Sequence, residues 1–255
     1  YDYYKKVIKF DSKKKQKMKS FLRQLLLGKI TKTDQPRLKI NPIKKRILNI
    51  RAIWNNDHQD DNGIEKIFRL FLSISQLLFP GIYIKYWVSK RNFEYQDIAM
   101  DSYILLKLLF PVLILKNHWQ EHTSLIYIMI YVLLETVLYI PTLIFASDML
   151  SRPRSYKRSM MLLFLNYLEI VCAFAVLYTL GNNMNRPFTH WFDPIYFSII
   201  TSNSVGYGDF YPVTTFAKVL VSIQAMFFLS FVVLFLNFFS SKVKSKGYFD
   251  HESEI

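Results

Sequence analysis

The apolar residues of this chain are gathered into long runs that predict a membrane protein built from helices. A helix needs about 20 mostly apolar residues to cross a bilayer. Three runs reach that length, at residues 123–147, 160–180 and 214–241. Residues 98–116 form a fourth, weaker run, because Asp101 and Lys107 interrupt it. A shorter mixed stretch at 192–213 separates the last two long runs. The pattern therefore predicts an all-α membrane protein with four spanning helices.

A different pattern at residues 64–79 predicts an amphipathic helix. Its polar residues recur at spacings of four, four and three, which places them on one stripe: Glu65, Arg69, Ser73 and Gln76. Apolar residues cover the rest of its surface, and Pro80-Gly81 ends it. A helix of this kind more often lies in the membrane interface than crosses the bilayer.

The positive charge is concentrated at the N-terminus. Residues 1–53 hold 17 Lys and Arg against three acids, which accounts for the whole net charge of +14. Positive segments of membrane proteins remain in the cytoplasm, so we expect this region there and not on nucleic acid. Its cluster Lys13–Lys19 is a candidate site for anionic lipid, and a solvated tail is the alternative.

A second basic group fixes the topology. It lies between two strong runs and consists of Arg152, Arg154, Lys157 and Arg158. Because this group also belongs in the cytoplasm, an even number of crossings separates it from the N-terminus. We take 98–116 and 123–147 as these crossings, with 64–79 on the cytoplasmic face. In an alternative that stays open, 64–88 crosses and 98–116 is a re-entrant segment on the outside. In either arrangement both termini are cytoplasmic.

These patterns divide the chain into five regions. They are a basic cytoplasmic region (1–62), an amphipathic interface segment (63–97), two peripheral transmembrane helices (98–150), a pore domain (151–241) and a short cytoplasmic tail (242–255). No second copy of any region follows from the sequence.

The mixed stretch contains a run whose residues suit a dehydrated potassium ion, Ser204-Val205-Gly206-Tyr207-Gly208-Asp209. Rings of backbone carbonyls can replace the ion's water if consecutive carbonyls point the same way. That geometry requires unusual backbone angles at alternate residues, which glycine adopts at low cost. Gly206 and Gly208 stand at alternate positions, and Val205 and Tyr207 can turn outward between them as a supporting cuff. Ser204 would add a ring of hydroxyls, so we expect K+ at Ser204, Val205, Gly206 and Tyr207.

This run resembles the signature of the potassium channel family, Thr-Val-Gly-Tyr-Gly-Asp. It departs from that signature at Ser204, which keeps the hydroxyl and loses a methyl group. The resemblance covers about residues 160–241, and Phe210-Tyr211-Pro212-Val213-Thr214 is most similar to bacterial members. It implies a two-helix pore module, four copies around one axis, and a bacterial inner membrane as the location.

The residues before the filter predict a short pore helix over 194–202. Asp193 is expected as its N-cap and Pro194 in its first turn. The negative end of this helix would point at the ion axis and favour a cation. Supporting roles are expected for Tyr196, Phe197, Thr201 and Asp209. The resemblance implies aromatic residues at the first two of these positions, and Tyr196 could hydrogen-bond Asp209.

The last apolar run is expected to line the conduction path. Ser230, Asn237 and Ser241 fall on one face, with Val233 and Leu234 near it. Polar groups in a membrane helix seek water or partners, so this face is a candidate cavity lining. Helix–helix packing through the same groups is the alternative. Lys107 and Glu135 are expected to pair inside the membrane, unless each reaches its own interface.

These features favour a potassium-selective channel that conducts passively as a homotetramer. A weakly selective cation channel and a non-conducting signalling subunit in the membrane are the alternatives. No nucleophile–base pair, phosphate loop or metal cluster stands out, so we expect no enzyme activity. No cofactor is expected besides potassium ions in the filter, and the expected partners are three identical subunits and membrane lipid.

Overall fold

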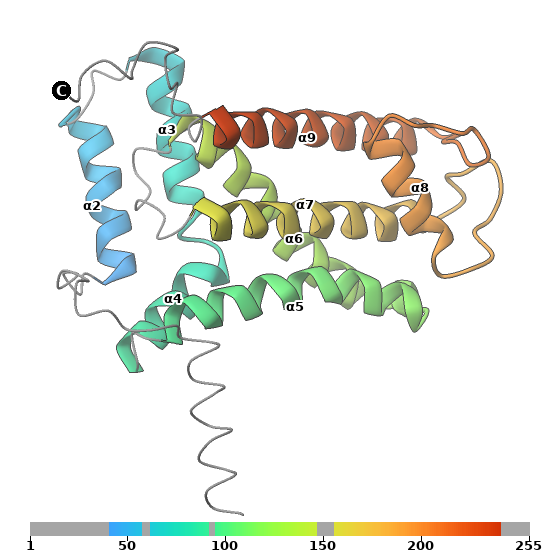
Figure 1. Cartoon of the computed structure of the whole chain (residues 1–255), viewed down its shortest axis with the longest axis horizontal. Helices are drawn as coiled ribbons and strands as arrows, with labels where there is room; N and C mark the ends of the chain where they lie inside the picture. The colour runs from blue at the N-terminus through green and yellow to red at the C-terminus, as the bar shows by residue number, and fades with distance from the viewer. Residues whose placement is uncertain (1–40, 58–61, 92–94, 147–155, 241–255) are drawn as a thin grey trace, which may run out of the picture.

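The computed structural model describes residues 41–57, 62–91, 95–146 and 156–240, and these ranges are mostly helical (Figure 1). The helices are α2 (Pro42–Asn55), α3 (Gly63–Ser75), α4 (Pro80–Arg91), α5 (Gln96–Lys116), α6 (Thr123–Phe145), α7 (Tyr156–Tyr178), α8 (Asp193–Ser202) and α9 (Thr215–Ser240), with the 3-10 turn η2 (Trp119–Glu121) between α5 and α6. Within the described ranges the only β pairing is an isolated bridge between Met184 and Pro212. The cluster Lys13–Lys19 and Ser241 lie outside the described residues.

Four helices are long and apolar enough to span a membrane, as the hydrophobic pattern predicts. They are α5, α6, α7 and α9. In Figure 1, α5, α7 and α9 lie roughly along the horizontal axis, and α6 lies oblique to them. Their bounds agree with the predicted runs to within a few residues. The weak run is one continuous helix, α5, even though Pro111 lies inside it.

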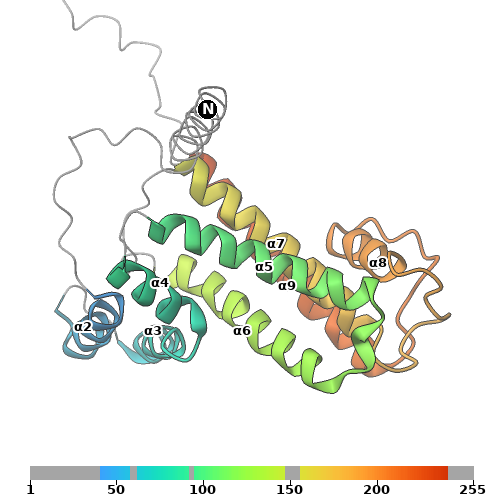
Figure 2. The same ribbon diagram turned by 90° about the horizontal axis from the view of Figure 1, so that it is seen from below.

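The two ends of this bundle differ. Helix α8 lies at one end and α2, α3 and α4 lie at the other, in both Figure 1 and Figure 2. Helices α3 and α4 are bent by 55° at a short break, so residues 64–88 do not form one straight helix. The C-terminal part of α9 reaches the same end as α3 (Figure 1).

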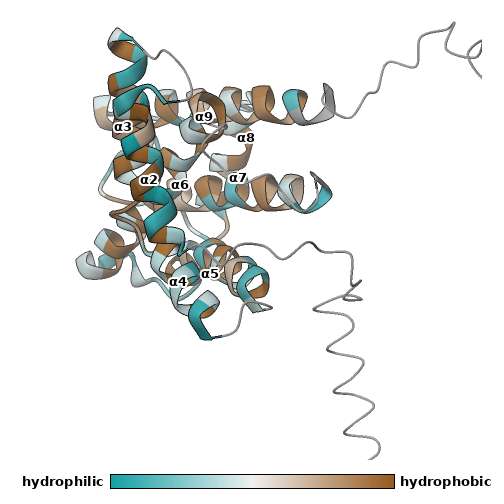
Figure 3. Ribbon diagram, turned by 90° about the vertical axis from the view of Figure 1, so that its left-hand side faces the viewer, coloured by the Kyte–Doolittle hydropathy of each residue, from teal (hydrophilic) through white to brown (hydrophobic). Residues whose placement is uncertain are grey.

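Helix α3 turns part of its polar stripe inward, although Glu65 in its first turn is exposed. Arg69 is 2% exposed and Ser73 is fully buried, whereas the apolar Ile64 and Ile67 are 87% and 69% exposed. Figure 3, which looks at this end, shows hydrophilic and hydrophobic residues on both α2 and α3. Apolar side chains directed away from the protein body suit contact with lipid, as the amphipathic pattern of this segment indicates.

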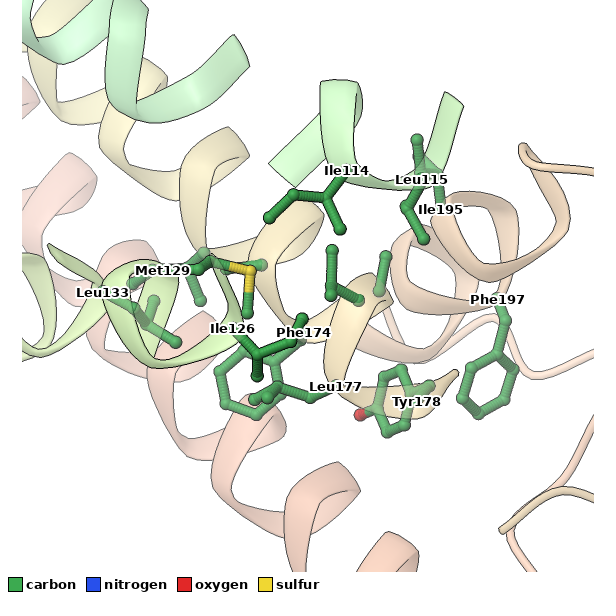
Figure 4. Packing of buried hydrophobic residues seen from close by; sticks show 14 of the residues in the cluster. Ile114, Leu115, Ile126, Met129, Leu133, Phe174, Leu177, Tyr178, Ile195 and Phe197 are labelled. Atoms are coloured by element: carbon green, nitrogen blue, oxygen red, sulfur yellow. The ribbon is translucent and has the colours of Figure 1, made fainter. Parts of the chain in front are cut away.

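The core forms around α7, which packs against α5, α6, α8 and α9. Figure 4 shows side chains of several helices meeting there. Helix α7 contributes Phe174, Leu177 and Tyr178 to this core. Ile114 of α5 and Met129 of α6 belong to the same cluster of buried side chains. Helix α7 therefore connects the peripheral helices α5 and α6 to α8 and α9.

Candidate ion-conduction pore

The pore helix forms where the sequence predicts it, but its first turn is built differently. Asp193 is the first residue of α8, and Phe192 is its N-cap. Instead of capping α8, the Asp193 carboxylate binds the preceding loop. It accepts hydrogen bonds from the backbone N–H groups of Thr189 and His190, at 2.9 and 2.8 Å, and from the Thr189 hydroxyl at 3.1 Å. The predicted N-cap role of Asp193 is therefore wrong, because the loop supplies donors closer to the carboxylate.

These hydrogen bonds also set the charge state of Asp193. Desolvation alone would raise the pKa of this carboxyl group. The three hydrogen bonds from Thr189 and His190 outweigh it and lower the pKa below its ordinary value of 3.8. The start of the pore helix is consequently held by an ionised carboxylate.

The backbone of the filter run alternates in the way that a carbonyl-lined path requires. Ser204, Gly206 and Gly208 have positive φ angles of 58°, 55° and 82°. The residues between them, Val205 and Tyr207, are not among the positive-φ residues. A left-handed residue at every second position turns successive carbonyls toward one side of the strand. The sequence pointed to the two glycines but not to Ser204, a non-glycine residue for which this conformation is uncommon.

The candidate filter run begins directly at the C-terminal end of α8. The carbonyl of Ile200 accepts hydrogen bonds from the N–H groups of Val205 and Gly206, at 2.8 and 3.4 Å. The carbonyl of Thr201, the half-buried supporting residue, accepts from the N–H of Ser204 at 3.1 Å. These contacts hold the strand against the end of the helix where the partial charge of the dipole is negative.

The expected side-chain cuff is not packed within the single chain. Val205 is 51% exposed and Tyr207 is 71% exposed. Both therefore leave apolar surface on this strand uncovered by the rest of the chain.

A buried polar network holds the middle of the pore helix. Gln224 of α9, 1% exposed, donates from Nε2 to the Ser198 carbonyl and hydroxyl oxygens at 3.1 and 2.7 Å. Its Oε1 accepts from the Tyr178 hydroxyl at 2.6 Å. The Ser198 hydroxyl in turn donates to the Val171 carbonyl at 2.6 Å. The three helices α7, α8 and α9 are thus joined through the side chains of Tyr178, Ser198 and Gln224.

Aromatic side chains fill the space behind α8, as the resemblance implied for Phe197. That residue is buried, and its ring meets the Tyr178 ring edge-on at 4.9 Å between centroids. Tyr196 is half-buried; desolvation and then the nearby Asp209 carboxylate raise its pKa. Near the end of α8, the Tyr167 hydroxyl lies 3.0 Å from the Ser202 hydroxyl and donates to Asn203 Oδ1 at 3.0 Å.

The loop after α7 contacts the C-terminal end of the filter run and the residues that follow it. Asn185 donates from its backbone N–H to the Tyr211 carbonyl at 3.0 Å, and its side-chain Oδ1 accepts from the Tyr211 N–H at 2.9 Å. Arg186 lies 3.8 Å from the Asp209 carboxylate, and its guanidinium stacks 4.2 Å from the centre of the Phe210 ring. Asp209 is therefore paired with a cation from a neighbouring loop.

The polar face of α9 is only partly as predicted. Asn237 is exposed, and Ser230 is half-buried with its hydroxyl donating to the Met226 carbonyl in its own helix at 3.0 Å. Val233 is exposed, but Leu234 is buried in the core. The expectation that Leu234 lies near the cavity is wrong, because its side chain packs into the core of this chain.

Several residues that hold the pore were not predicted from the sequence. They are Tyr167, Tyr178, Asn185, Ser198 and Gln224. Gln224 carried a usable signal, since an amide inside an apolar membrane helix requires hydrogen-bond partners. Its partners depend on how three helices are rotated, which the sequence of one helix does not reveal.

Comparison with known proteins agrees with this geometry. A family model described as "Ion channel" matches residues 162–245. No curated protein and no solved structure matches the chain. The matched range contains most of α7, the pore helix α8, the filter and α9. Residues 162–245 are thus similar to an ion-channel domain.

Proposed function

We propose that this protein is a potassium-selective channel that conducts passively through four filter strands around a common axis. One observation carries the proposal, namely the left-handed φ angles at Ser204, Gly206 and Gly208 at the C-terminal end of the pore helix. This alternation is the backbone condition for a column of carbonyl ligands. The ions would bind at Ser204, Val205, Gly206 and Tyr207, without any other cofactor or catalytic step.

Assembly into a homotetramer follows from the incompleteness of the single chain. One strand faces an ion from one side only, so several copies must surround it. The exposure of Val205 and Tyr207 supports contacts with adjacent subunits. Helix α9 also leaves an apolar stripe exposed that suits subunit or cavity contacts, formed by Phe216, Val219, Ile223, Met226, Leu229, Val233 and Leu236.

The proposed orientation places the filter toward the outside of a plasma membrane. The basic N-terminal region and the C-terminal tail would lie in the cytoplasm, on the side of α2 and α3. Anionic lipid at Lys13–Lys19 and a polar cavity lining at Ser230, Asn237 and Ser241 belong to this proposal. The bacterial origin implied by the resemblance stays a prediction.

Two other functions compete with selective conduction. A weakly selective cation channel is favoured by Ser204, because the missing methyl group changes the innermost ligand ring. A non-conducting signalling subunit would use the basic N-terminal region to recruit a partner.

Cation flux from liposomes that contain the purified protein separates the three functions. A potassium channel releases K+ down its gradient and leaves Na+ inside, whereas a weakly selective channel releases both ions. The absence of flux for either ion would support the signalling subunit and refute conduction.

A further inference from the structure

A cluster of ionisable side chains lies within the membrane-spanning part, away from the filter. Lys107 of α5 lies between Glu169 of α7, with Nζ to Oε2 at 3.3 Å, and Glu135 of α6, with Nζ to Oε2 at 3.8 Å. The side chains are 6%, 2% and 18% exposed, respectively. The Lys107–Glu135 pair was predicted, and Glu169 joins it through helix packing. We propose that this cluster is a proton-binding site centred on Glu169, and that the pore responds to its proton.

The charge balance of the cluster calls for one proton. With all three groups ionised, one ammonium faces two carboxylates, which leaves one excess negative charge in an apolar environment. Uncompensated charge is costly there. Binding of one proton forms an O–H bond on a carboxylate and breaks an O–H bond of hydronium, which removes the excess charge without any redox change.

Of the two carboxylates, Glu135 has the hydrogen-bond donors that stabilise the charged form. It accepts from the Gly81 N–H at 3.1 Å and from the Tyr103 hydroxyl. Gly81 lies in the first turn of α4, where the helix dipole favours negative charge. A Cβ on Gly81 would overlap Glu135 Oε1, so a larger residue here would displace this carboxylate oxygen from the Gly81 N–H.

Glu169 is the carboxylate better placed to hold the proton. Among the described residues, its one hydrogen-bonding neighbour besides Lys107 is Thr136, whose hydroxyl oxygen lies 3.1 and 2.9 Å from the two carboxylate oxygens. That hydroxyl can donate to the charged form or accept from the protonated one. Lys107 is nearer to Glu169 than to Glu135, which favours charge on Glu169. The difference of half an ångström is small beside the two donors and the helix terminus that serve Glu135.

Within the described part of the packed helices, Lys107 is the one titratable side chain that an ion pair or hydrogen bond joins to Glu169. Of the remaining titratable groups near Glu169, Cys172 lies one turn along α7, and Tyr103 of α5 donates to Glu135. Tyr131 of α6 donates to the Leu78 carbonyl and not to the cluster. Helix α4 presents the Gly81 N–H, and among the described residues of α8 and α9 no titratable side chain forms an ion pair or hydrogen bond with Glu169.

Glu169 lies between two residues of α7 that hold the pore helix. Two positions before it, Tyr167 contacts Ser202 and Asn203 at the base of the filter. Two positions after it, the Val171 carbonyl accepts the Ser198 hydroxyl. A change of charge at Glu169 alters its attraction to α5 and α6, and α7 transmits any resulting shift to α8. The proposal depends on the proposed function only for this effect on conduction.

Infrared spectroscopy of the purified protein in liposomes tests the proton site directly. Spectra from about pH 5 to about pH 9 follow the carbonyl band of a protonated carboxylic acid. The wild type should lose one such band per subunit with one-proton dependence, and Glu169→Gln should remove the band at all pH values. In Lys107→Gln, which lacks the counter-charge, the band should persist to higher pH. Glu121→Gln, at an exposed loop carboxylate, is the matched control and should titrate like the wild type.

Potassium flux over the same pH series tests the coupling to the pore. Wild-type flux should change with pH, and Glu169→Gln should hold flux at the wild-type low-pH level throughout. The proposal is overturned if the band persists in Glu169→Gln, if no band titrates, or if Glu169→Gln retains the pH dependence of flux. If no variant conducts at any pH, the proposed function fails, while the infrared result still decides the proton site.

Discussion

Replacing Gln224 by leucine should both destabilise the fold and loosen the filter. The amide is 1% exposed and makes three hydrogen bonds, two to Ser198 and one from Tyr178. Leucine has a similar size but makes none of them. Each lost hydrogen bond is worth about 0.5–1.5 kcal/mol net, and a buried hydroxyl left without an acceptor costs about 1–3 kcal/mol. We expect the free energy of unfolding to fall by about 2–4 kcal/mol per subunit.

A double-mutant cycle separates the hydrogen bonds from general packing. Tyr178→Phe alone leaves Gln224 Oε1 without its donor, and Gln224→Leu alone leaves the Tyr178 hydroxyl without its acceptor. Since the double variant leaves neither group unsatisfied, its destabilisation should be smaller than the two single effects added, by at least about 1 kcal/mol. Ser222→Ala is the matched control, because Ser222 is exposed on the same helix and donates only to the Lys218 carbonyl.

Unfolding in mixed detergent micelles, followed by tryptophan fluorescence, measures these free energies. Potassium and sodium flux in liposomes then reports on the filter. We expect Gln224→Leu to lower the preference for K+ over Na+, since the Ser198 contacts fix the helix that carries the filter. Wild-type stability in Gln224→Leu, or strictly additive effects in the cycle, would refute the role assigned to this network.

Three further predictions follow from single positions. Gly206→Ala should abolish K+ flux. Gly63→Ala is its control, because Gly63 has a similar φ of 58° and, like Gly206, has no atom within 4 Å of an added Cβ; each change should lower the free energy of unfolding by ~1–2 kcal/mol, but Gly63→Ala should leave flux intact. Equal flux in the two variants would contradict the filter assignment. Because its pKa is lowered in the fold, Asp193 should contribute stability above pH 3.8 that is lost as pH falls further, and Asp193→Asn should remove that part of the acid dependence in pH-dependent unfolding. Arg158→Gln, which breaks partly exposed ion pairs with Asp97 and Asp101, should cost about 1 kcal/mol or less, and the loss should shrink with added salt.

The positions of the helices were predictable because each leaves a local signal. Apolar runs gave α5, α6, α7 and α9, and a proline in the first turn marked α8. The pattern of two alternate glycines predicted the unusual backbone of the filter, since few other residues adopt it at low cost.

What the sequence did not predict depends on contacts between distant segments. The Ser204 angle follows from hydrogen bonds to the end of α8, and the Asp193 contacts follow from the path of one loop. The partners of Gln224 and the third member of the Lys107 cluster depend on helix rotation. An apolar membrane helix packs in many rotations, so its sequence alone leaves this choice open.

The central claim is that the filter strand selects potassium, and a reversal potential measures selectivity most directly. The purified protein would be placed in a planar bilayer with K+ on one side and Na+ on the other. Each tenfold preference for K+ moves the reversal potential by about 59 mV toward the K+ equilibrium potential. We predict a shift well beyond that value for the wild type. A reversal potential near zero, or no current after the folded protein has been incorporated into the bilayer, would contradict the claim.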